Sequence, residues 1–283
     1  MHKSVIILVT LLVLAGCSST FAYNNIDWLV YWYIDDYIDL TEEQEQQFDT
    51  NMSSWLKWHR DTELRLYETH INQIRHRALT AAMSPEDILD ELSIARQHWL
   101  RLRDEVAPGL AQMAPLLSDE QVIYLFAQLE RENQKQQDER LNELKDTSEK
   151  QRFDNQIKRI TSQVEDYIGK TTSQQRQLIR TYAPQLQSTD NYWLAYRRKT
   201  QQVARELFAN RENNPEFVEQ LTQLIKNPDG HRSSEHNRVS NQNSLIYATM
   251  LSELQAIMSD KQRRRLNKKI DQFVDDLDDL IGA

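Results

Sequence analysis

The residues in this sequence that could act as metal ligands form three pairs: His59 with Glu63 and His70 with His76 on an expected long helix, and His231 with His236 in a polar, turn-rich insertion. Imidazole and carboxylate groups are common ligands of zinc. The spacing His-Glu-x-x-His, which puts two ligands and a general base on one face of a helix, does not occur. Histidines on helices are more often core or surface residues, so we predict no metal site.

Carboxylates form two clusters, one of Asp35, Asp36 and Asp39 and one of Asp275, Asp276, Asp278 and Asp279. Catalytic carboxylates need burial to separate their pKa values, and solvated helix faces explain both clusters more simply. No nucleophile, base and orienting group can be named together. The five glycines are too scattered for a phosphate-binding loop. We therefore predict no catalytic residue, no cofactor and no nucleotide partner.

The charge of the chain argues against nucleic-acid binding. Asp and Glu number 43 against 34 Lys and Arg, for a net charge of −9, whereas nucleic-acid-binding domains are usually basic. A basic patch occurs at Arg263, Arg264 and Arg265 with Lys268 and Lys269. This patch is either an exposed helix face or a contact for anionic lipid or an acidic partner.

Cys17 is the one cysteine, and it follows an apolar run that is too short to span a bilayer. A basic start, an apolar run and small residues are typical of a secretory signal. The ending Leu14-Ala15-Gly16-Cys17 resembles the lipobox of bacterial lipoproteins. This resemblance implies a signal peptide over 1–16, removed before an acylated Cys17 that anchors the chain to a lipid bilayer.

The alternative is ordinary cleavage after Ala22, which would discard Cys17 and release a soluble protein. We favour the lipoprotein interpretation because the single cysteine lies where a lipobox places it. Ser18 follows the cysteine, and in the lipoproteins that this sequence resembles a serine there usually permits export. We therefore expect the inner leaflet of the outer membrane, facing the periplasm.

Composition predicts an all-α fold. Five glycines and six prolines in 283 residues, with abundant Gln, Glu, Leu, Arg and Lys, suit long helices and not hairpin-rich sheets. Residues 17–40 are expected to form the anchor, a short tether and an aromatic helix. In this helix Trp28, Tyr31, Trp32 and Tyr33 could contact lipid headgroups or a partner, or could form part of the core. A Tyr-Asn-Asn-x-Asp-Trp-Leu segment after a lipobox resembles a family of uncharacterised proteobacterial lipoproteins.

One helix-start device recurs along the chain. It has Thr or Ser at the N-cap and Gln three residues later, which together can form a capping box. Its four occurrences are Thr41 with Gln44, Ser118 with Gln121, Thr172 with Gln175, and Ser259 with Gln262. Capped starts that contain proline, Ser84-Pro85 and Asn214-Pro215, lie between the members of each pair.

This order predicts an internal duplication of helical hairpin or bundle units, over 41–140 and 172–283. Each half would hold a long first helix, a second helix with the proline cap and a final helix. A connecting helix is expected over 141–171, and a polar insertion near 227–237 accounts for the greater length of the second half.

Two Leu-Thr-x-x-Gln-like helix starts about 75 residues apart resemble periplasmic chaperones of the Spy type. Those proteins are helical hairpins that dimerise into a curved cradle, so the resemblance implies a cradle made by the two halves. Two departures stand out: this chain is acidic, and Thr171 replaces the expected leucine. We predict a chaperone-like or adaptor function that binds envelope proteins or unfolded clients. The alternative is a structural partner that docks one envelope complex through residues 23–39.

Overall fold

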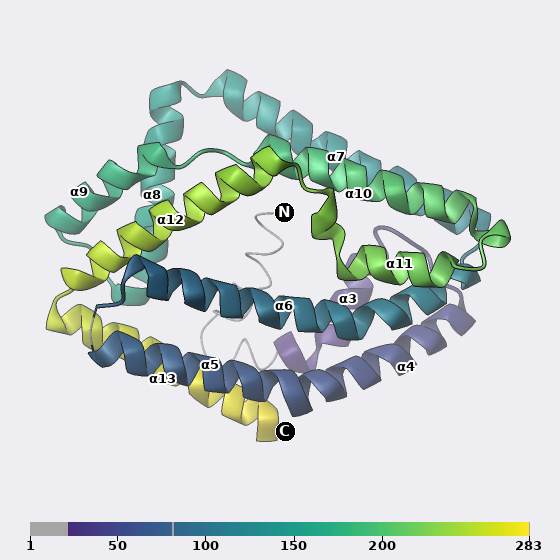
Figure 1. Ribbon diagram of the computed structural model, residues 1–283, viewed down its shortest axis with the longest axis horizontal. Coiled ribbons are helices and arrows are strands. Elements are labelled where there is room, and N and C mark those ends of the chain that lie inside the picture. Colours follow the sequence, from purple (N-terminus) through teal and green to yellow (C-terminus); the bar gives the residue numbers. More distant parts are fainter. Residues whose placement is uncertain (1–21, 81, 283) are drawn as a thin grey trace.

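The computed structural model describes residues 22–80 and 82–282, and every regular element within them is helical, which confirms the all-α prediction (Figure 1). The α-helices are α3 (Ile26–Ile34), α4 (Glu42–Trp58), α5 (Leu64–Thr80), α6 (Pro85–Met113), α7 (Asp119–Asp146), α8 (Glu149–Ile168), α9 (Ser173–Tyr182), α10 (Asp190–Ala209), α11 (Phe217–Lys226), α12 (Ser234–Ala256) and α13 (Asp260–Gly282). Cys17 and the expected signal peptide lie outside the described residues.

The expected long first helix is present as a rod in which α4 and α5 are joined by a π-helical turn at His59–Glu63. Trp55 and Tyr67 are twelve residues apart, which in a regular α-helix would leave them about 120° apart around the axis. The π turn accommodates one extra residue and removes about 100° of this difference. Tyr67 is therefore half-buried, while Leu66 is 39% exposed.

The two halves of the chain share their cores. Ala111, Val122 and Phe126 of the first half form one cluster with Phe208, Phe217, Leu221 and Leu224 of the second half. Leu64 of α5 forms another with Leu277 and Leu280 of α13. As a consequence, α11 and α12 both pack against α6, and α13 lies along α5 (Figure 1). The halves are therefore interlocked and are not two separate hairpin units.

The second half also follows a different path from the first. No long helix begins at Thr172, because α9 ends at Tyr182, and α10 starts only at Asp190. Pro215 precedes α11 instead of opening it, since the N-cap residue of that helix is Glu216. The polar insertion holds a 3₁₀ turn, Pro228–His231, followed directly by the start of α12. The internal duplication thus stays a prediction.

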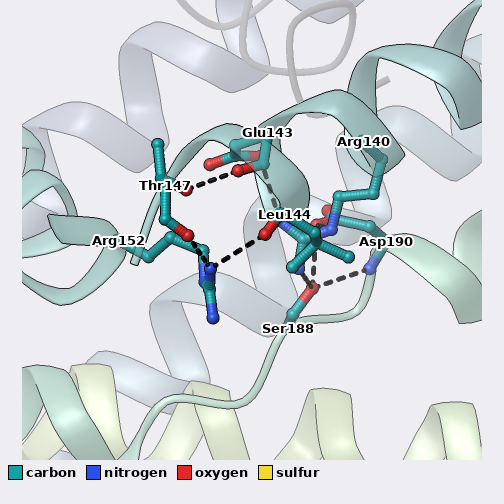
Figure 2. Close-up of polar contacts among 7 residues, drawn as sticks. All are labelled: Arg140, Glu143, Leu144, Thr147, Arg152, Ser188 and Asp190. Atoms are coloured by element: carbon teal, nitrogen blue, oxygen red, sulfur yellow. Dashed lines mark hydrogen bonds and ion pairs between the residues drawn. The ribbon is translucent and has the colours of Figure 1, made fainter. Parts of the chain in front are cut away.

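No single connecting helix spans 141–171. The helix α7 ends at Asp146 and α8 begins at Glu149, with Ser148 and Gln151 forming another capping box. Figure 2 shows how this corner is held: Arg152 donates to the carbonyls of Thr147 and Leu144, which are left without helical partners. Arg140 of α7 reaches across to Ser188 before α10, so the corner is also tied to the second half (Figure 2).

Candidate functional site

All four predicted starts carry the expected side-chain caps. In the first, the backbone N–H of Gln44 donates to Thr41 Oγ1 at 3.4 Å, and the backbone N–H of Thr41 donates to Gln44 Oε1 at 3.0 Å. The same two bonds are made in the other three pairs: Ser118 with Gln121, Thr172 with Gln175, and Ser259 with Gln262. The motif therefore does at these positions what its sequence predicts.

The capping glutamines also pair with each other across the fold. Gln44 Nε2 donates to Gln121 Oε1 at 3.0 Å, and Gln121 Nε2 donates to Gln44 Oε1 at 2.7 Å. The second N–H of each side-chain amide donates to a backbone carbonyl: that of Gln44 to Leu116, and that of Gln121 to Asp39. Both amides are thus fully used, and the pair joins the starts of α4 and α7, which are 77 residues apart in the chain.

A second pair is built in the same way. Gln175 and Gln262 exchange hydrogen bonds of 3.0 and 2.9 Å between the starts of α9 and α13, and Gln262 also donates to the Lys170 carbonyl. Gln175 is fully buried and Gln262 is 5% exposed. Sequence reasoning found these glutamines as caps and missed their pairing. The sequence feature that could have indicated this pairing is that the capping motif occurs twice in each half of the chain, once near its beginning and once near the start of its last helix.

Replacing the first cap tests the local part of this arrangement. We expect Thr41→Ala to lower the free energy of unfolding by about 1 kcal/mol, because the N-cap hydroxyl that accepts the Gln44 amide is lost. Thermal and urea melts of the variant and the parent would measure the change. An unchanged melt would mean that the cap at Thr41 contributes nothing to stability.

A groove of about 540 Å³ lies over the first glutamine pair. Two apolar side chains line it, Leu116 at 51% and Tyr124 at 45% exposed. Its acidic lining residues are Asp39, Glu43 and Glu120, and no Lys or Arg is among the residues that line it. The groove therefore combines apolar surface with an acidic rim, on a floor that the glutamine pair holds in place.

The aromatic helix α3 is divided between core and surface. Tyr31 donates to Asp49 at 2.7 Å and packs edge-on against Phe48, so it lies against a core cluster formed by Phe48, Trp55 and Met113. Burial, with the Asp49 hydrogen bond as the next cause, raises the pKa of Tyr31. Trp28 and Trp32 are each 65% exposed and Tyr33 56%. Three of the four predicted contact residues are therefore exposed, and Tyr31 is only partly exposed because it packs on Phe48.

The histidines of the first half are not paired as the metal hypothesis considered them. His98 Nδ1 lies 2.5 Å from Glu63 Oε1, His98 Nε2 lies 3.1 Å from His70 Nδ1, and His70 Nε2 lies 2.8 Å from Glu91 Oε2. All four side chains are buried. We call this the buried Glu–His–His–Glu row. Within the described residues no group of three or more His, Cys, Asp or Glu could hold a metal ion.

Two arginines close the ends of the row. Arg101 donates from Nε and Nη2 to the two oxygens of Glu63, each at 2.9 Å, and Arg77 donates to Glu91 at 2.8 Å. Sequence reasoning missed this row. Its signal was a repeated spacing, since Glu63 and His70 are seven residues apart on one helical rod, and Glu91 and His98 are seven apart on α6. Because this rod and α6 are antiparallel where they pack together, the glutamate of each lies beside the histidine of the other.

Burial shifts the titration of the groups around the row. It lowers the pKa of His98 against the opposing effect of Glu63, and it lowers the pKa of His59. It also raises the pKa of Tyr67, which packs edge-on against His98 at 4.6 Å between ring centroids. The arrangement thus favours a neutral His98 between a carboxylate and a second imidazole.

Comparison with known proteins places the chain by sequence. A model for a family of unknown function, DUF6279, matches residues 36–238, which is more than half of the chain. The chain belongs to the DUF6279 family. The match in this DUF6279 protein runs from the end of the aromatic segment into α12, and it includes the first glutamine pair and the buried row. No curated protein and no solved structure matches the chain.

Membership in an uncharacterised family agrees with the expectation from the sequence, while the lipobox and the likeness to Spy-type chaperones stay predictions. Among the described helices of this DUF6279 protein, none is long and apolar enough to cross a membrane.

Proposed function

We propose that this DUF6279 protein is a non-enzymatic adaptor of the bacterial envelope, anchored through acylated Cys17 and binding proteins through the groove over Gln44 and Gln121. The groove is the observation that carries the proposal. Exposed Leu116 and Tyr124 offer apolar contact beside three carboxylates with no cation among the lining residues. Large exposed apolar side chains beside polar groups are typical of protein-binding surfaces.

The chemistry of the groove defines its partner. A segment that places a bulky apolar side chain next to Lys or Arg would bury the former on Leu116 and Tyr124. Its cation would lie beside Asp39, Glu43 or Glu120. Complementary charge of this kind raises the association rate and selects against acidic segments. The expected partner is therefore a basic amphipathic segment of an envelope protein, and binding should weaken with salt.

Peptide binding tests this partner chemistry. The full chain in detergent would be titrated with a labelled Leu/Lys peptide and with a Leu/Glu peptide of the same length, with fluorescence anisotropy as the readout. We expect at least tenfold tighter binding of the Leu/Lys peptide, and at least a tenfold loss of that affinity in the double variant Glu43→Lys/Glu120→Lys. The double variant Glu139→Lys/Glu149→Lys, which makes the same charge change at exposed residues outside the groove lining, is the matched control.

Crosslinking in cells tests the same surface in the envelope. A photo-reactive residue at Tyr124 should capture one defined protein, and the Glu43→Lys/Glu120→Lys change should abolish that product. A probe at Leu141, which is 54% exposed, controls for exposure alone. Equal capture from both positions, or binding of both peptides with equal affinity, would contradict a selective groove. Suppression of the aggregation of an unrelated protein by the charge-reversed variant would instead support a chaperone-like action.

The exposed face of α3 favours a second function, docking to one envelope complex. Trp28 and Trp32 are one helical turn apart and equally exposed, so they form one face. If this face docks a partner, Trp28→Ala or Trp32→Ala alone should abolish co-purification with that complex and leave peptide binding in the groove intact. Loss of peptide binding in the same variants would show instead that the change had disturbed the fold.

A further inference from the structure

The exposed face of α13 is divided into two halves of opposite charge. The helix packs on α5 and α8 through its other side, which holds the buried residues Gln262, Leu277 and Leu280. The exposed side chains recur at steps of three and four residues, so they form one stripe along the helix. Its cationic half consists of Lys261, Arg264, Arg265 and Lys268. Its acidic half consists of Asp271, Asp275, Asp278 and Asp279, with the neutral Gln272 between them.

This division of charge does not stabilise the helix itself. Arg264 and Lys268 are four residues apart, and like charges at this spacing repel each other. The acidic half repeats the same spacing. Lys261 lies in the first turn and Asp279 in the last turn, which is the reverse of the order that the helix dipole favours. The stripe is therefore unfavourable within one helix, and a partner with the opposite order of charge would neutralise it.

The charges of the stripe have few partners within the chain. Asp271 Oδ1 lies 2.9 Å from Arg75 Nη1 of α5 and forms an ion pair with it. In the part of the chain that the structure describes, the other charged side chains of the stripe form no ion pair. Arg263, which belongs to the basic patch expected from the sequence, is half-buried and donates to the Gln255 carbonyl. The charges that stay on the surface are thus those of the stripe.

We propose that α13 of one copy of the chain binds α13 of a second copy in antiparallel orientation, about a two-fold axis between Asp271 and Gln272. A two-fold interface requires a surface that is complementary to itself, and the stripe has this property. Three pairs of opposite charge face each other, and the symmetry repeats each pair: Arg264 with Asp279 of the second copy, Arg265 with Asp278, and Lys268 with Asp275.

The centre and the orientation of this interface are specific. At the axis Asp271 lies opposite Gln272 of the second copy, and Arg75 already compensates its charge. A parallel copy would place each half against its like. An anionic lipid surface would attract the cationic half and repel the acidic half. Exposed ion pairs are individually weak and are screened by salt, so we expect a dimer that dissociates as the ionic strength rises.

Exchange of charge tests the pairing in the full chain in detergent. By analytical ultracentrifugation the parent should be dimeric at about 20 mM salt and mostly monomeric at about 500 mM. We expect association at low salt to weaken by about tenfold or more in an all-acidic and in an all-basic variant. An equimolar mixture of the two should associate again, because every pair is restored. The variants are Arg264→Asp/Arg265→Asp/Lys268→Asp and Asp275→Lys/Asp278→Lys/Asp279→Lys.

Crosslinking tests the register. In the antiparallel dimer the two copies of position 272 face each other across the axis, whereas the two copies of position 261 are about 30 Å apart along the helices. With a short bis-maleimide, Gln272→Cys should therefore give a covalent dimer and Lys261→Cys should not. The parent chain, treated in the same way, controls for reaction at Cys17.

Three outcomes would overturn the proposal. A parent chain that stays monomeric at low salt would do so without any variant, and so would a mixture of the two folded variants that does not associate. Covalent dimers from both cysteine variants would contradict the antiparallel register. A monomeric parent that binds phosphatidylglycerol vesicles, together with an all-acidic variant that does not, would show that the stripe meets lipid and not a second copy.

Discussion

Replacing Glu63 with Gln should lower the free energy of unfolding by about 3 kcal/mol, the largest effect that we expect from a single conservative change. Glu63 is fully buried, and its two oxygens accept hydrogen bonds from Arg101 and face His98. An amide of the same shape fills the same space but removes the negative charge. Arg101 is 38% exposed, so water compensates it in part, which keeps the expected loss at the low end for a broken buried pair.

Urea unfolding followed by circular dichroism would measure this loss as a shift in midpoint at constant m-value. Asp61→Asn is the matched control, because Asp61 lies two residues away and pairs with Lys57 on the surface, with side chains that are 55% and 78% exposed. Such a pair contributes little, so its midpoint should not change. Equal shifts in the two variants would mean that the buried ion pair contributes no more to stability than the surface pair.

The second large effect is expected at the buried glutamine pair. We expect Gln175→Ala to lower the free energy of unfolding by about 2–3 kcal/mol, because it removes the pairing with Gln262 and leaves the buried side-chain amide of Gln262 without this partner. Gln151→Ala removes the same kind of capping glutamine, but Gln151 is exposed and its bonds are to Ser148. This control should cost only about 0.5 kcal/mol.

A double-mutant cycle separates pairing from capping. The variant Gln175→Ala/Gln262→Ala should lose less free energy of unfolding than the sum of the two single variants, with a coupling energy of about 1–2 kcal/mol. The reason is that the second substitution removes an amide that the first substitution has already left without its partner. Urea unfolding of the four proteins gives this coupling directly. Additive losses would mean that the two amides act as independent caps and that their contact contributes nothing of its own.

The sequence predicted the helical class and the local caps, because both depend on neighbouring residues. Thr41 and Gln44 are three residues apart, and their bonds form within one turn. The break between α7 and α8 was also available in principle, since Ser148 and Gln151 have the same spacing, but it was missed because the surrounding residues are uniformly polar. Local patterns were sufficient wherever the chain makes its contacts within a few residues.

Contacts over long distances in the chain were not predicted. A capping glutamine already has a local role, so nothing near Gln44 indicates that it also binds Gln121. The two halves looked equivalent by their spacing, yet packing of Phe126 against Phe208 gives them one core. The buried row depends on two helices meeting antiparallel in one register, which a single sequence does not specify. In each case the deciding partner lies far away in the chain.

The π turn at His59–Glu63 has a consequence for how the two ends of the rod can vary. The α4 end faces α6 and α3, whereas the α5 end faces α13 and the buried row. The extra residue brings the packed side chains of α5 to nearly the same side of the rod as those of α4, so one continuous helix can serve both sets of neighbours. A one-residue deletion in this turn would rotate α5 by about 100° relative to α4 and would turn its packed face away from α13.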